Sequence, residues 1–227
     1  MGEFIDGAFD VLASRQAYTS PYMRLREDDV RFPDGSLGVW TVLERSDFAL
    51  AVPEVAPGRL VMVNLYRHPV GRRFWEFPQG SAASPGVSPQ RTAAEELREE
   101  AGCAAEAWQP LGVLHEAYGY ATGACHVFLA RSLTTVGQRP EPGEGDIRLG
   151  VFDTEEIWRM HDAGDLTDAV TVAALGLYER TRHGTDRRPG RQDGTETRPG
   201  RQNGTASRPG RQNGTAWSRP GQRGGTE

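Results

Sequence analysis

The sequence predicts a layered α+β sandwich followed by a disordered C-terminal tail. Three observations support this fold class. Strand-like and helix-like segments are mixed along the chain without the strict alternation of a parallel βαβ fold. A segment in the middle carries the signals of a capped helix. The last part of the chain, residues 183–227, is a repeat with almost no apolar side chains.

A β-hairpin is expected near the N-terminus. Pro-Asp-Gly-Ser at 33–36 is rich in turn residues, and it separates two strand-like runs at 24–32 and 37–43. Further strands are expected at 47–52 and 60–66. The second of these reads Leu-Val-Met-Val-Asn-Leu-Tyr, which is apolar enough for the interior of a sheet.

A capped helix is expected from Pro89 to Ala101. Ser88 can accept a hydrogen bond from an amide of the first turn, and Pro89 suits the first helical position. Gly102 favours the left-handed conformation that ends a helix. The elements that follow continue the mixed pattern. They are strands at 111–116, 126–130 and 148–152 and helices at 154–161 and 166–180.

The composition of the chain changes near His183. From there, copies of Arg-Pro-Gly-Arg-Gln recur every ten residues, and the few apolar side chains cannot offset the entropy lost on ordering. Nine arginines against four acidic residues give this tail a net charge of +5, which can attract nucleic acid. Because Trp217 is the only aromatic residue among the arginines, a functionless extension is favoured. The predicted division is an N-terminal β region at 1–56, a main domain at 57–182 and the tail at 183–227.

Several classes of protein are excluded by what the sequence lacks. It contains no lysine, which excludes a lysine Schiff base and a P-loop lysine. No apolar run approaches the length needed to span a bilayer. The two cysteines, Cys103 and Cys125, and an N-terminus without a signal-like segment favour a reducing, cytoplasmic location.

Three glutamates crowd one face of the predicted helix. Glu96, Glu99 and Glu100 stand at positions i, i+3 and i+4, which are neighbours on a helix surface. Like charges so close repel one another unless a cation lies between them. Hard oxygen ligands suit Mg²⁺, or Mn²⁺, and these ions in turn suit phosphate substrates. The pattern therefore predicts a metal-dependent phosphate chemistry.

The segment from Gly80 to Cys103 resembles the Nudix box, G-x5-E-x7-R-E-U-x-E-E-x-G-U, in which U is a bulky apolar residue. The second half of the box matches at Glu96-Leu-Arg-Glu-Glu-Ala-Gly-Cys103. Other motifs resemble the ADP-ribose pyrophosphatase branch of this family, and they lie at 32–36, 64–71, 75–80, 126–130 and 164–174. The resemblance implies a Nudix-type α/β/α sandwich with a mixed sheet and a small N-terminal antiparallel sheet.

The box departs from the family pattern at three positions. Counting back from its last glycine places the first glycine at Ser81, so Gly80 fits only with one inserted residue. Val87 stands where the box has its first Glu, and Glu95 stands where it has Arg. In the family, this Glu and Arg are thought to stabilise one another. Because both are replaced here, neither is left as an uncompensated buried charge. Glu95 is expected to pair instead with Arg91 or Arg98.

By resemblance, Glu96, Glu99 and Glu100 are metal ligands, together with a backbone carbonyl near Gln79 and Gly80. A Mg²⁺ ion held there would neutralise a diphosphate and polarise phosphorus for attack by water. Glu99 and Glu100 are for this reason also the expected catalytic residues.

A further acid is expected from a later acidic loop, as a ligand or as the general base. Glu144 is the first choice and Asp146 the second, because both precede the strand expected near residue 148.

Three further residues are candidates for substrate binding. Arg67 resembles the family arginine that contacts the diphosphate or ribose side, and guanidinium suits phosphate in charge and geometry. Glu76 is expected to bind a base or ribose, with a role at the strand end as the alternative. Tyr118 stands where the ADP-ribose branch commonly has proline, which leaves other nucleoside diphosphate sugars open. It is expected either to shape the pocket or to serve as a turn tyrosine.

Two functions follow from this pattern. The first is Mg²⁺-dependent hydrolysis of ADP-ribose or a related nucleoside diphosphate sugar, which gives a nucleoside monophosphate and a sugar phosphate. The alternative is a non-catalytic Nudix-fold module that binds a nucleotide or a partner. The resemblance also implies a homodimer that pairs through the N-terminal sheet.

Overall fold

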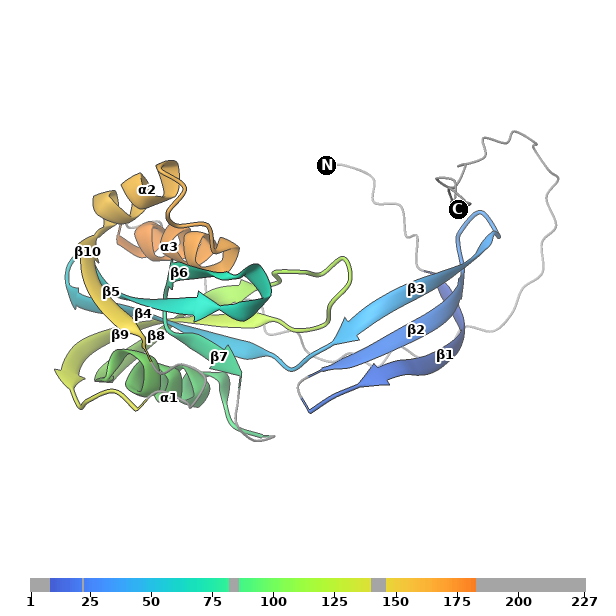
Figure 1. The fold of residues 1–227 in the computed structure, drawn as a ribbon, viewed down its shortest axis with the longest axis horizontal. Coiled ribbons are helices and arrows are strands. Elements are labelled where there is room, and N and C mark those ends of the chain that lie inside the picture. Colours follow the sequence, from blue (N-terminus) through green and yellow to red (C-terminus); the bar gives the residue numbers. More distant parts are fainter. Residues whose placement is uncertain (1–8, 22, 82–85, 140–145, 183–227) are drawn as a thin grey trace, which may run out of the picture. The chain divides into compact units, whose positions relative to one another are not determined.

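The computed structural model describes residues 9–21, 23–81, 86–139 and 146–182, and its strands form two sheets (Figure 1). The smaller sheet is antiparallel, in the order β1-β2-β3. Its strands are β1 (Asp10–Thr19), β2 (Arg24–Arg31) and β3 (Leu37–Glu44). The expected N-terminal hairpin is therefore confirmed, and β1 adds a strand that the sequence pattern did not predict.

The larger sheet follows the path β10-β5-β4-β9-β8, with β6 paired to β5 and β7 paired to β4. Strands β4 and β9 are parallel while the other pairs are antiparallel, so the sheet is mixed, as expected. Its strands are β4 (Phe48–Ala56), β5 (Arg59–Arg67), β6 (Arg72–Glu76), β7 (Gln79–Ser81), β8 (Cys103–Leu114), β9 (Cys125–Thr135) and β10 (Arg148–Asp153). The helices are η1 (His68–Val70), which is a 3-10 helix, α1 (Pro89–Ala101), α2 (Thr154–Asp162) and α3 (Ala169–Arg182).

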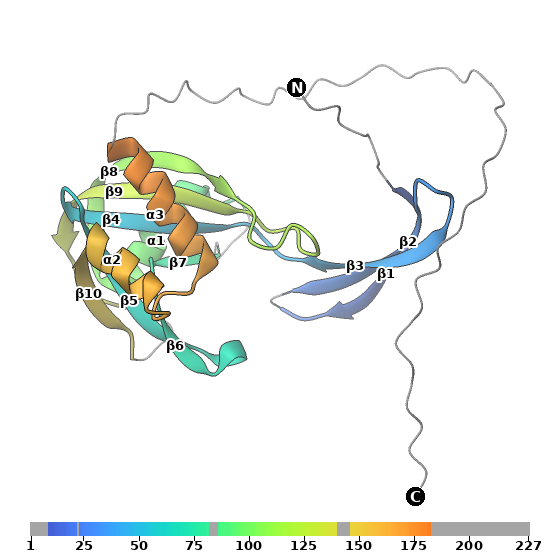
Figure 2. The same ribbon diagram turned by 90° about the horizontal axis from the view of Figure 1, so that it is seen from above.

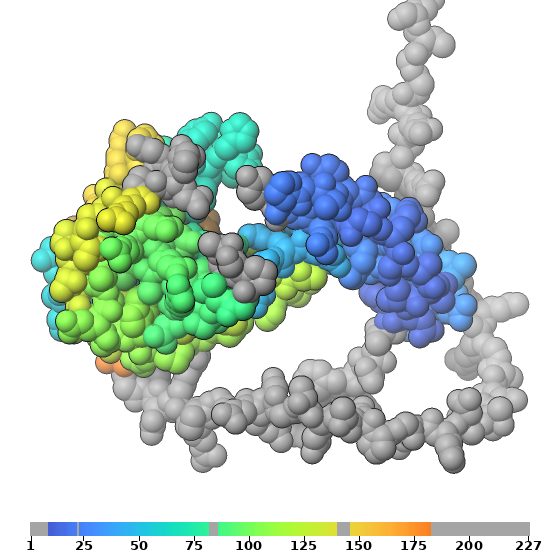
Figure 3. Space-filling model, turned by 90° about the horizontal axis from the view of Figure 1, so that it is seen from below, coloured from blue at the N-terminus to red at the C-terminus, as the bar shows by residue number. Residues whose placement is uncertain are grey.

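Helices cover both faces of the larger sheet, which makes the α/β/α sandwich that the sequence predicts (Figures 1 and 2). The side chains of β4 show how one strand serves two layers, since successive residues of a strand point to opposite faces. Phe48, Leu50 and Val52 pack with α2 and α3 in one core. Ala49 and Ala51 pack with α1 in the other. In the space-filling view from below, α1 and β8 cover this second face in green (Figure 3).

The central helix forms where the local signals place it. The Ser88 side chain accepts a hydrogen bond from the amide of Arg91, and Pro89 is the first helical residue. Gly102 has a φ of 62° and donates its amide to carbonyls of the last turn. A residue with a Cβ is strained at such a φ, so glycine ends the helix here. The helix carrying the three glutamates therefore has the bounds expected from the sequence.

Several boundaries differ from those that the sequence suggests, and three of these differences affect the arrangement of the site. The boundary between the sheets lies before β4, not at residue 56, because β4 is a buried central strand of the larger sheet. Strand β8 begins at Cys103, directly after α1, rather than at 111. Helix α3 begins at Ala169 rather than at 166, because Asp168 accepts a hydrogen bond from the amide of Thr171. The expected disordered tail lies outside the described residues.

None of the described helices is long and apolar enough to cross a membrane.

Candidate active site

The candidate site lies where α1 faces the short strand β7. Glu100, in the last turn of α1, is 1% exposed, while Glu96 and Glu99 are half-buried. The backbone amide of Gln79 donates to Glu100 Oε2 at 3.1 Å. Strand β7 is held in turn by its pairing with β4. The structure thus brings Glu100 to the backbone segment that was expected to supply a metal-binding carbonyl.

Gly80 makes room for a second glutamate. A Cβ built on Gly80 would overlap the carboxylate of Glu96, so glycine at this position lets that carboxylate lie against the β7 backbone. Glu96 and Glu100 therefore reach the same two-residue stretch, Gln79 and Gly80, from neighbouring turns of α1. This close approach explains why the position requires glycine.

The donor chemistry of this stretch fits a divalent cation. Carboxylates from α1 and the nearby backbone of β7 are hard oxygen donors, of the kind that Mg²⁺ prefers. In the part of the chain that the structure describes, however, no three His, Cys, Asp or Glu side chains gather as a metal-binding cluster. The assignment of Glu96, Glu99 and Glu100 as ligands stays a prediction, supported by Glu96 and Glu100 at the β7 backbone.

Gly80→Ala is expected to lower the rate of the predicted metal-dependent reaction about 10- to 100-fold, because the added Cβ displaces the Glu96 carboxylate by a distance that matters for catalytic groups. The free energy of unfolding should change little, since the atoms that must move are the flexible end of the half-buried Glu96 side chain. Gly176→Ala is the matched control, because a Cβ there meets open space inside α3. It should keep full activity and gain about 0.5–1 kcal/mol of stability from better helix propensity. Steady-state kinetics and thermal unfolding of both variants measure this, and an active Gly80→Ala enzyme would contradict the role of Glu96.

Arg67 and Glu76 form an ion pair beside the α1 carboxylates. Arg67 ends β5 and Glu76 ends β6, and the two strands are paired. The Arg67 guanidinium donates from Nε to Glu76 Oε1 at 2.9 Å, and its Nη2 lies 2.6 Å from the same oxygen. Both residues were expected to bind substrate, and the structure brings them together. Their role in substrate binding stays a prediction.

The charges of this pair depend on its burial. Burial raises the pKa of Glu76 to about 7, although Arg67 opposes the rise. Burial also works against the charged form of Arg67, but Glu76, Glu100 and Asp168 outweigh it and raise the pKa of the guanidinium. The raised pKa of Glu76 favours a neutral carboxyl group, whereas the raised pKa of Arg67 reflects charged carboxylates around the guanidinium. Because the Glu76 carboxyl is almost fully enclosed and the Arg67 side chain is partly exposed, burial dominates for Glu76.

Asp168 joins this group, and the sequence pattern did not single it out. The side-chain amide of Gln79 donates to Glu76 Oε2 at 3.1 Å and to Asp168 Oδ2 at 3.3 Å. An aspartate directly before an apolar helix is a capping signal. The sequence pattern predicts that the helix begins at residue 166, which places Asp168 inside the helix. For this reason its capping role was not predicted.

The later acidic loop is only partly described. Glu144, expected to be the general base, lies outside the described residues. Asp146 is held by Arg73, whose Nη1 donates to Asp146 Oδ2 at 2.6 Å and whose Nε donates to Asn64 Oδ1 at 2.6 Å. The hydrogen bond from Arg73 lowers the pKa of Asp146. Asp146 thus ties the end of this loop to strands β5 and β6.

Two further sequence predictions concern the surface. Glu95 accepts a hydrogen bond from Arg91 Nε at 2.9 Å, so the pair expected on the outside of α1 is present. Tyr118 lies in the β8–β9 loop with 83% of its surface exposed. In the same loop, the Tyr120 carbonyl accepts a hydrogen bond from the Leu43 amide at 2.7 Å. No hydrogen bond of the described structure joins Tyr118 to the carboxylates of the candidate site, so its substrate role stays a prediction.

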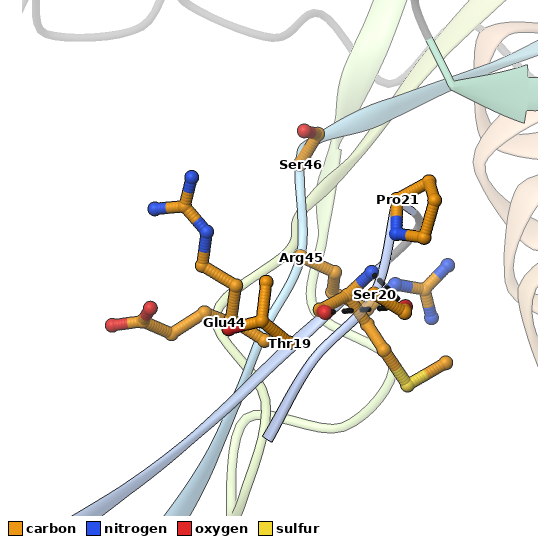
Figure 4. Close-up of a pocket in the computed structure, with 8 residues that line it drawn as sticks. Thr19, Ser20, Pro21, Glu44, Arg45 and Ser46 are labelled. Atoms are coloured by element: carbon orange, nitrogen blue, oxygen red, sulfur yellow. Dashed lines mark hydrogen bonds between the residues drawn. The ribbon is translucent and has the colours of Figure 1, made fainter. Parts of the chain in front are cut away.

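A pocket of about 540 Å³ lies apart from these carboxylates, at the end of the small sheet (Figure 4). It is lined by Thr19, Ser20, Pro21, Met23, Arg24, Glu44, Arg45 and Ser46. None of the predicted site residues is among them.

Comparison with known proteins assigns the class that the fold and the acidic helix indicate. The model of the NUDIX domain matches residues 47–175, which span β4 to the middle of α3. The chain therefore belongs to the Nudix family, and it is a hydrolase. A second family model, described as the nucleoside diphosphate sugar hydrolase N-terminal domain, matches residues 9–43. Within the Nudix family, the chain therefore resembles the nucleoside diphosphate sugar hydrolase branch.

Individual relatives agree with the family assignment. An ADP-ribose pyrophosphatase of Mycobacterium tuberculosis is 36% identical over 169 residues, which cover 74% of this chain and 81% of that protein. An ADP-ribose pyrophosphatase of Bacillus subtilis is 25% identical, over 72% of this chain and 89% of that protein. The crystal structure of an ADP compounds hydrolase has a TM-score of 0.68 at 20% identity, over 81% of this chain and 98% of that chain. This last likeness supports the fold.

Proposed function

We propose that this hydrolase cleaves the diphosphate bond of ADP-ribose or a related nucleoside diphosphate sugar, with Mg²⁺ as the cofactor. The products would be a nucleoside monophosphate and a sugar phosphate. The observation that carries the proposal is the contact of the α1 glutamates with Gln79 and Gly80, next to a partly exposed arginine. The names of the two bacterial pyrophosphatase relatives support the choice of substrate.

The α1 glutamates would bind the metal ion. Glu96, Glu99 and Glu100 would hold Mg²⁺ with a carbonyl of Gln79 or Gly80. The bound ion would neutralise charge on the diphosphate and polarise phosphorus. Mn²⁺ has similar ligand preferences and is expected to substitute for it.

Substrate and water would be placed by residues outside α1. Arg67 would bind the diphosphate, since guanidinium donates planar, charged hydrogen bonds to phosphate oxygens. Glu76 would orient Arg67 through the observed ion pair. Glu144 would accept the proton of the attacking water. Tyr118 would contact the substrate at the outer edge of the active site.

A substrate panel tests this function. ADP-ribose and other nucleoside diphosphate sugars are incubated with Mg²⁺, Mn²⁺ or EDTA, and nucleoside monophosphate is measured by chromatography. We expect metal-dependent release of AMP from ADP-ribose or of the corresponding monophosphate from another sugar. A chain truncated after Arg182 should behave like the full chain, because the described site elements all precede that point. Binding without turnover on every compound would instead favour a non-catalytic nucleotide-binding role.

A second part of the proposal is a homodimer in the cytoplasm, and the small sheet supports the dimer. Large apolar side chains are exposed on both faces of its strands, and exposed apolar surface is typical of protein interfaces. They include Val11, Leu12, Tyr18, Leu37, Val39 and Trp40. Pairing with a second copy would remove this surface from water.

A double variant, Val11→Lys with Val39→Lys, is expected to convert the dimer to a monomer. Val11 pairs with Val30, which pairs with Gly38, so Val11 and Val39 lie on opposite faces and each face receives a charge. Val39 is 55% exposed, so the folded subunit should tolerate the change. The control is Val113→Lys on β8, which is 53% exposed and lies outside the small sheet. Light scattering after size exclusion measures the mass, and a monomeric wild-type protein would disprove the dimer.

A further inference from the structure

Asp168 connects the start of α3 to the candidate site. One oxygen, Oδ2, accepts the amide of Thr171 at 2.9 Å and the side-chain amide of Gln79 at 3.3 Å. The first bond caps α3, while the second reaches a residue 89 positions earlier in the chain. Asp168 therefore contributes to more than the helix that it begins.

A second bond from α3 reaches the same segment. The hydroxyl of Thr171 accepts the backbone amide of Phe77 at 3.1 Å, and both residues are fully buried. The start of α3 thus contacts the segment from Phe77 to Gln79 at two points, through Asp168 and Thr171. These two contacts add to the pairing of β7 with β4 in restraining that segment.

Gln79 connects these contacts of α3 to α1. Its side-chain amide has two hydrogens and meets two carboxylates, Glu76 and Asp168. Its backbone amide meets Glu100. Because both acceptors of the side chain are carboxylates, the orientation of this amide is defined. Asp168, Gln79 and Glu100 therefore form a continuous set of hydrogen bonds from α3 to α1.

We infer that Asp168 is a positioning residue of the hydrolytic site, which acts by holding the Gln79 amide so that the β7 backbone meets Glu100 in a fixed geometry. This role rests on the proposed function of the α1 glutamates. It assigns to α3, which contains none of the expected ligands, a part in arranging them.

A double-mutant cycle tests the inference. Asp168→Asn keeps a good capping residue on α3 but weakens the charge-assisted bond to Gln79, and it should lower kcat about tenfold with little change in KM. Gln79→Ala should lower kcat at least as much. If Asp168 acts through Gln79, the double variant should be no slower than Gln79→Ala alone. Additive losses, or an Asp168→Asn enzyme with the wild-type kcat, would overturn the inference. Asp165→Asn, on the exposed turn before Asp168, is the control and should keep wild-type kinetics.

Hydrogen exchange gives a readout that does not depend on turnover. In Asp168→Asn, the backbone amides of residues 76–81 should exchange faster than in wild type, while those of α3 should keep their protection because Asn still caps the helix. Unchanged exchange in 76–81 would overturn the positioning role. An inactive wild-type protein would contradict the proposed function instead, and the exchange measurement would still decide the role of Asp168.

Discussion

Glu100→Gln is expected to reduce hydrolysis by about a thousandfold or more while the protein remains folded. A metal ion that acts as a Lewis acid supplies several kcal/mol of transition-state stabilisation, and each 1.36 kcal/mol corresponds to about tenfold in rate. Glu100 is the most deeply buried of the three glutamates, and it meets the β7 backbone directly. Loss of its charge should therefore weaken metal binding more than loss of a charge at the surface.

The same substitution should leave the fold intact. Glutamine has nearly the same shape as glutamate, and its carbonyl oxygen can still accept the amide of Gln79. Removing one of several neighbouring negative charges also relieves repulsion, since Asp168 and Glu76 lie on the other side of Gln79. A change in unfolding free energy of less than about 1.5 kcal/mol is expected for such an isosteric change.

Glu95→Gln provides the matched control on the same helix. Glu95 pairs with Arg91 on the outer surface of α1, and exposed pairs of this kind contribute at most about 1 kcal/mol. This variant should hydrolyse the substrate at close to the wild-type rate. Monophosphate release and metal titration of wild type and both variants make the comparison. A fully active Glu100→Gln enzyme would remove Glu100 from the metal site.

The local features of α1 could be predicted from the sequence because they depend on neighbouring residues only. Ser88, Pro89 and Gly102 each act on the backbone within one helical turn, and the structure has all three as expected. The face shared by the glutamates follows from helix periodicity alone. The alternation that divides β4 between two cores is local in the same sense.

Other parts of the site depend on contacts between distant segments. Strands β6 and β7 are short and carry arginine, glutamine and glycine, so no apolar alternation identifies them; their extended state comes from pairing with β5 and β4. Arg67 and Glu76 were both recognisable as candidates, but their pairing depends on the register of two strands. Asp168 was missed because its second partner, Gln79, is reached only in the folded protein.

The free energy of unfolding of the metal-free protein should contain a contribution from Glu76 that falls as pH rises from about 5 to about 7. The carboxyl has a pKa of about 7 when folded, against an ordinary value of 4.5. Between these values the folded state keeps a proton that the unfolded state releases. This stabilising contribution is therefore complete below the ordinary pKa, decreases as pH rises and levels off above 7. The difference between the two pKa values corresponds to about 3 kcal/mol.

Glu76→Gln should remove this dependence, because glutamine does not titrate. At pH 5 folded Glu76 is protonated and neutral, and a glutamine carbonyl oxygen can still accept the Arg67 hydrogen bond, so the variant is expected to be about as stable as wild type there. The gap should then shift in favour of the variant by about 3 kcal/mol between pH 5 and pH 8. Urea unfolding in EDTA at several pH values measures the gap, and Glu95→Gln, with its carboxyl on the surface of α1, should follow the wild-type curve. Parallel curves for wild type and Glu76→Gln would show that Arg67 keeps Glu76 charged throughout. In that case Glu76 would be ionised despite its burial, and Arg67 would meet a diphosphate while paired with a charged carboxylate.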